Sequence, residues 1–131
     1  MIPAALLITA LMFGGTVLYS FAFAPFVVTA LPSGTSGPLI RRAFPHFYVF
    51  VIATSGIAAG IAALFDVRSS VILAIIAVTT VISRQIVMPA VNAATDAGAK
   101  TRFKVLHSVS VLITLSHIGA AGYVIVRLAS L

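Results

Sequence analysis

An uninterrupted apolar stretch at the start of the chain is the feature that most constrains its fold. No Asp, Glu, Lys or Arg precedes Arg41, and residues 2–31 are largely apolar. As a straight helix, this run of about 30 residues is roughly 45 Å long, whereas the hydrocarbon core of a bilayer is roughly 30 Å thick. The apolar runs are continuous, so they lack the alternation of apolar and polar residues that a membrane β-barrel requires. The sequence therefore predicts an all-α integral membrane protein.

The composition supports this prediction. Hydrophobic residues make up 61% of the 131 residues and charged residues only 8%, whereas soluble domains carry about 25% charged residues. The net charge is +6, but the basic residues lie between apolar runs. We therefore expect them to set the membrane topology and to contact anionic lipids of the bilayer, and we expect no nucleic-acid partner. The chain has no cysteine, which excludes disulfides and thiolate metal sites.

Four apolar runs are long enough to cross a bilayer, which predicts a four-helix bundle in a single domain of residues 1–131. The expected spans are approximately 2–31, 44–65, 71–91 and 105–127. Pro25 predicts a kink or a break near residues 21–24, because proline lacks an N–H and clashes with the preceding turn. The Pro, Gly, Ser and Thr residues of 31–38 predict a loop, and the polar stretch 92–104 predicts another.

The distribution of basic residues predicts the orientation of the bundle. An even number of spans places both termini on one side. Arg68 and Arg127 fall on that side, and six basic residues fall on the other: Arg41, Arg42, Arg84, Lys100, Arg102 and Lys104. Because basic loops stay in the cytoplasm, we expect both termini on the non-cytoplasmic side. In a bacterium, the location of such a multi-pass protein would be the inner (plasma) membrane.

Small residues predict where helices approach closely. Helices in lipid associate through close packing and hydrogen bonds, so glycine and alanine stripes favour contact. Gly56 and Gly60 form such a small-xxx-small element on the second span. Its partner is either a helix of the same chain, which we take as the default, or another chain in a homo-oligomer or membrane complex.

The fourth span carries a polar stripe. At 100° per residue, His107, Ser110, Thr114 and His117 occupy one face about 80° wide. Polar groups in hydrocarbon need partners, so this face is expected to point into the bundle. The structural interpretation is that the hydroxyls bond their own helix and the histidines join helices.

Polar or aromatic groups from all four spans are predicted to reach a similar depth towards the cytoplasmic side. Ionisable groups within a membrane often mark functional sites. For Arg84 the alternative is that its long stem extends to the lipid headgroups. The predicted ligand-binding residues are Tyr19, His46, Arg84, Asn92, His107 and Ser110.

Two of these residues suggest a cofactor. His46 and His107 are expected at matching depths on different helices, as a bis-histidine haem requires. A metal-ion site is not expected, because no His-x3-His pair occurs and no carboxylate lies within an apolar run.

Several short motifs, in a characteristic order, resemble the family of transmembrane protein 205 and its bacterial relatives. The motifs are Phe13-Gly14-Gly15, Phe21 through Pro25, Leu31-Pro32, Phe44-Pro45-His46-Phe47-Tyr48, Arg84 with Pro89, Phe103, Leu106-His107 and Ser110-Val111. The resemblance implies a four-helix membrane protein of undefined activity. It also implies roles for Arg84, Pro89, His107 and Ser110. Ser83 and Thr114 depart from the pattern, because asparagine often occupies these positions in the family.

Three functions are compatible with the sequence. The first is binding or handling of a small anionic or lipid-like ligand in a polar pocket at the cytoplasmic end, since a cationic pocket favours such molecules. The second is a redox protein that binds haem or quinone. The third is a structural or assembly subunit of a membrane complex. No nucleophilic triad, phosphate-binding loop or carboxylate pair occurs, so ordinary hydrolysis and phosphoryl transfer are not expected. Whether the chain is an enzyme is left open.

Overall fold

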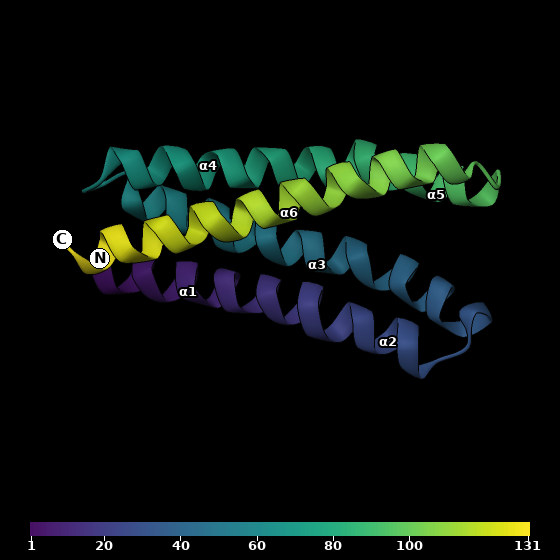
Figure 1. Ribbon diagram of the computed structural model, residues 1–131. Coiled ribbons are helices and arrows are strands. Elements are labelled where there is room, and N and C mark those ends of the chain that lie inside the picture. Colours follow the sequence, from purple (N-terminus) through teal and green to yellow (C-terminus); the bar gives the residue numbers. More distant parts are fainter.

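The computed structural model describes residues 1–131 as four long helices that run up and down in one bundle (Figure 1). Each helix is long and apolar enough to cross a membrane. Both termini lie at the same end of the bundle (Figure 1). In chain order, the elements are α1 (Ile2–Leu18) and α2 (Ala24–Ala30), α3 (Ser33–Ala62), α4 (Val67–Ile82) and α5 (Met88–Asp96), and α6 (Lys100–Ala129).

The connections between the helices are shorter than the sequence predicts. The loop predicted at residues 31–38 is wrong, because α3 begins at Ser33. The polar stretch 92–104 is also mostly helical, with α5 ending at Asp96 and α6 beginning at Lys100. Two or three residues suffice to join antiparallel helices. The Gly, Ser, Thr and Pro residues therefore extend the helix ends, and turn propensity alone gave loops that were too long.

A π-helical turn precedes each of two prolines inside the spans. The turn Tyr19–Phe23 joins α1 to α2 before Pro25, and the turn Ser83–Val87 joins α4 to α5 before Pro89. Proline cannot donate to the carbonyl four residues earlier and clashes with it. A π turn accommodates the proline within a continuous helix. The irregularity predicted near residues 21–24 is thus a π turn rather than a break.

Small and hydroxyl residues form much of the contact surface within the bundle. Ala58, Ala59 and Ala62 of α3 are buried. Thr9 and Thr80 are also buried, and each hydroxyl donates to the carbonyl four residues earlier in its own helix. The backbone therefore satisfies these hydroxyls, and helices can pack over them without cross-helix polar partners.

The glycines do not all lie at helix contacts. A Cβ at Gly15 would lie 2.7 Å from Cε1 of Phe50, so any larger residue where α1 meets α3 would force the Phe50 ring to move. Gly56 and Gly60 are exposed, with no atom within 4 Å of where a Cβ would be. The default expectation that Gly56 and Gly60 pack against a helix of the same chain is therefore wrong.

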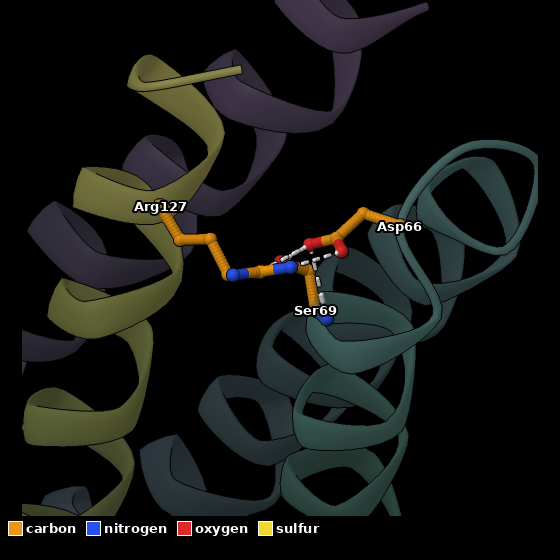
Figure 2. Close-up of polar contacts among 3 residues, drawn as sticks. All are labelled: Asp66, Ser69 and Arg127. Carbon is orange, nitrogen blue, oxygen red and sulfur yellow. Dashed lines mark hydrogen bonds and ion pairs between the residues drawn. The ribbon is translucent and has the colours of Figure 1, made fainter.

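Ion pairs lie at the two ends of the bundle. At the end that holds the termini, Arg127 of α6 reaches Asp66, which caps the start of α4 (Figure 2). At the other end, Arg41 of α3 pairs with Asp96 of α5 at 2.9 Å. These pairs connect helices that are distant in sequence, and they engage both carboxylate side chains of the chain.

Candidate functional site

Arg84 is the central residue of the candidate site. It lies in the π turn before Pro89 and is half-buried. Its Nε donates to the carbonyl oxygen of Pro45 at 3.3 Å, and its Nη1 donates to Oε1 of Gln85 at 2.8 Å. Both partners are neutral. The positive charge of Arg84 therefore has no carboxylate counterion, since Asp66 and Asp96 are paired elsewhere.

Tyr19 contributes an aromatic cluster beside this level of α3. Its ring stacks on Phe47, with centroids 4.2 Å apart, and meets the edge of Phe44 at 5.1 Å. It also stacks on Phe23, at 5.2 Å. The Tyr19 hydroxyl is buried and has no hydrogen-bond partner. An unsatisfied buried hydroxyl is costly, so it marks a position where a polar group of a ligand or water would be stabilised.

The other four predicted binding residues differ in how far they are exposed and in what they contact. Ser110 is half-buried and lies beside the hydroxyl of Tyr48. Asn92 is half-buried on α5, and His46 is exposed on α3. His107 is exposed and stacks on Phe103 of its own helix, with centroids 5.4 Å apart. The structure thus brings Arg84 into contact with Pro45, the residue that precedes His46. His107 instead contacts Phe103 of its own helix.

The polar stripe of the fourth span is therefore divided. Thr114 and His117 line a small interior cavity of about 10 Å³, together with Thr80, Ser83 and Tyr48. This volume is comparable with the space that one water molecule occupies. His107, nearer the other end of the stripe, is exposed. The expectation that the whole stripe faces the interior is wrong for His107.

A second, larger hollow lies between α4 and α6. This groove has a volume of about 450 Å³, and its lining is mostly apolar, with Thr79, Ser116 and His117 as the polar members. His117 and Ile113 line both the groove and the interior cavity. Sequence analysis placed His117 on the polar stripe but did not include it among the binding residues. Its position on the stripe was the only signal available.

The fold defines a class: a small multi-pass membrane protein of four apolar helices. Within this class, the chain belongs to the family described as domain of unknown function (DUF4149), whose sequence pattern matches residues 7–100. The match includes Tyr19 and Arg84 and stops at the start of α6. No curated protein and no solved structure matches the chain.

Proposed function

We propose that the chain binds the anionic group of a small lipid-like molecule at Arg84, towards the end of the bundle that is remote from the termini. The observation that carries this proposal is the half-buried guanidinium of Arg84, which has only neutral partners. A charge removed from water is costly unless an opposite charge or several hydrogen bonds compensate it. A guanidinium also matches the geometry of carboxylate and phosphate groups. Arg84 therefore favours an anionic ligand.

The charges around this end support the same ligand class. Arg41 and Arg42 lie on α3, and Lys100, Arg102 and Lys104 lie in the first turns of α6. Asp96 is the only carboxylate at this end, and it is already paired with Arg41. We propose that this end is cytoplasmic and that the termini are non-cytoplasmic, as the positive-inside rule predicts. The excess positive charge would attract anionic amphiphiles from the inner leaflet.

The other predicted residues surround Arg84 in this proposal. The unpartnered hydroxyl of Tyr19 would bind a further polar atom of the ligand. Ser110, His46, Asn92 and His107 would form the rim. We also infer kinship with the transmembrane protein 205 family, because its motif residues include Arg84, Pro89, His107 and Ser110.

Native mass spectrometry of the purified protein tests this proposal. The protein is titrated with phosphatidylglycerol and, separately, with phosphatidylcholine, and the bound fractions are compared. We expect a preference for the anionic lipid that falls about tenfold in Arg84→Gln, since a hydrogen bond to a charged group contributes about 1.5–3 kcal/mol.

Arg102→Gln is the matched control, because it removes the same charge from an exposed position. We expect it to reduce the preference only slightly. Equal losses in the two variants would show that general surface charge, rather than Arg84, attracts the lipid, and would overturn the proposal. Circular dichroism of each variant establishes that the helices are intact.

A further inference from the structure

A hydrogen bond between Thr79 of α4 and His117 of α6 fixes the tautomer of this histidine, which lies near the middle of the bundle. Oγ1 of Thr79 lies 2.7 Å from the carbonyl oxygen of Ile75 and 2.7 Å from Nε2 of His117. A carbonyl oxygen carries no hydrogen, so the hydroxyl proton of Thr79 must bridge the first contact. The second contact must then be bridged by a proton on Nε2 of His117.

This arrangement leaves Nδ1 of His117 as a free acceptor. A neutral imidazole with a proton on Nε2 has its lone pair on Nδ1. No group of the chain donates a hydrogen bond to Nδ1 of His117. The hydroxyl oxygen of Tyr19 is the only fully buried side-chain polar atom without a partner, so Nδ1, which also has no partner, is not fully buried. An acceptor in a hydrocarbon environment is stabilised by a donor that comes from outside the chain.

The other polar groups of the groove have the same character. Ser116 donates its hydroxyl proton to the carbonyl of Leu112, as Thr79 does to that of Ile75. The groove therefore presents acceptor lone pairs and no free donor. No Lys, Arg, Asp or Glu lines it. Its polar chemistry thus complements an uncharged donor, such as a hydroxyl group.

The apolar lining of the groove favours a ligand whose remaining part is hydrocarbon. Ile72, Ile75 and Ile82 line the groove along roughly 15 Å of α4, and Val109 and Leu112 line it from α6. The volume of about 450 Å³ lies within the range of small-molecule sites, roughly 300–1,000 Å³. Both helices are long and apolar enough to span a membrane, so the groove opens towards lipid chains.

We propose that the groove between α4 and α6 binds a hydrocarbon chain whose uncharged hydroxyl group donates a hydrogen bond to Nδ1 of His117. This site is separate from the anionic site proposed above, because Arg84 contacts α3 through Pro45 and does not line the groove. The ligand class is an uncharged long-chain alcohol.

Nitrogen-15 NMR of the histidine side chains in detergent micelles tests the proposal with two matched probes. Oleyl alcohol carries a hydroxyl donor, and oleyl methyl ether has the same chain without a donor. The His117 signals are assigned by their loss in His117→Phe. We expect a protonated Nε2 and an unprotonated Nδ1, and we expect oleyl alcohol to shift the Nδ1 signal upfield with about fivefold tighter binding than the ether.

Two tryptophan variants show whether the groove is the binding site. Ile75 and Ile57 are each 56% exposed, but only Ile75 lines the groove. Ile75→Trp should abolish the response to oleyl alcohol, and Ile57→Trp should preserve it. A proton on Nδ1, an equal response to both probes, no response to either, or a response that survives Ile75→Trp would each overturn the proposal. Arg84→Gln should leave the response unchanged, so the two proposed sites can fail independently.

Discussion

The guanidinium of Arg127 binds the Asp66 carboxylate through two hydrogen bonds of 2.7 Å, and it thereby joins the last turns of α6 to the start of α4 (Figure 2). Asp66 also accepts hydrogen bonds from the backbone N–H and the hydroxyl of Ser69. One carboxylate thus caps α4 and holds α6. Because the Asp66 residue is only 7% exposed, little water competes for these bonds.

We expect Asp66→Asn to lower the midpoint of thermal unfolding in detergent by several degrees. The amide loses the charge that pairs with Arg127, and it leaves a half-buried guanidinium without a counterion. Asp96→Asn is the matched control, because Asp96 and Arg41 are 66% and 40% exposed. Exposed ion pairs contribute little, so this control should shift the midpoint much less. Equal shifts would contradict the role assigned to Asp66.

The Asp66 carboxylate should also make the stability of the fold depend on pH. Hydrogen bonds from Arg127, with a further contribution from Ser69, hold the pKa of Asp66 well below its ordinary value of 3.8. A lowered pKa in the folded state means that the stabilisation is complete above the unfolded-state pKa and is lost as the pH falls through the folded-state value.

The unfolding midpoint of the unaltered chain should therefore fall more steeply below about pH 4 than that of Asp66→Asn. Thermal unfolding followed by circular dichroism across this pH range gives the comparison. Parallel pH profiles for the two proteins would show that Asp66 does not carry the acid sensitivity.

Gly15 should tolerate a methyl group less well than its neighbour Gly14. A Cβ at Gly15 would lie 2.7 Å from the Phe50 ring, whereas a Cβ at Gly14 meets no atom within 4 Å. We expect Gly15→Ala to destabilise the chain by about 1–3 kcal/mol through overpacking, and Gly14→Ala to be neutral or stabilising. Unfolding in detergent measures the difference. Adding Phe50→Leu to Gly15→Ala should recover part of the loss, and no recovery would place the strain elsewhere.

Pro89 should affect ligand binding through the π turn that carries Arg84. In Pro89→Ala, residue 89 regains an N–H that can donate to the carbonyl of Gln85, so we expect the π turn to relax towards an α-helix. The Arg84 side chain would then turn away from Pro45 of α3. The preference for phosphatidylglycerol should fall about as far as in Arg84→Gln. Pro3→Ala is the control, since proline near a helix start costs no hydrogen bond. Unchanged binding in Pro89→Ala would separate the π turn from the site.

The sequence by itself determined the membrane-spanning character, the four helices and the approximate place of one irregular turn, near residues 21–24. These follow from properties that lie along the chain: apolar runs of sufficient length, and the missing N–H of Pro25. The second π turn, before Pro89, was not predicted. The sequence did not determine the helix ends at Ser33 and Asp96, because turn residues are also tolerated in the polar ends of long helices.

Only the tertiary structure decided which polar groups meet. The sequence placed His107 and His117 on one face of α6, but the structure exposes His107 and pairs His117 with Thr79. It likewise buries the contact at Gly15 and leaves Gly56 exposed. The reason is that contacts depend on the rotation, tilt and offset of neighbouring helices. Lipid and protein interior are both apolar, so hydropathy cannot tell which side of a transmembrane helix faces its neighbours.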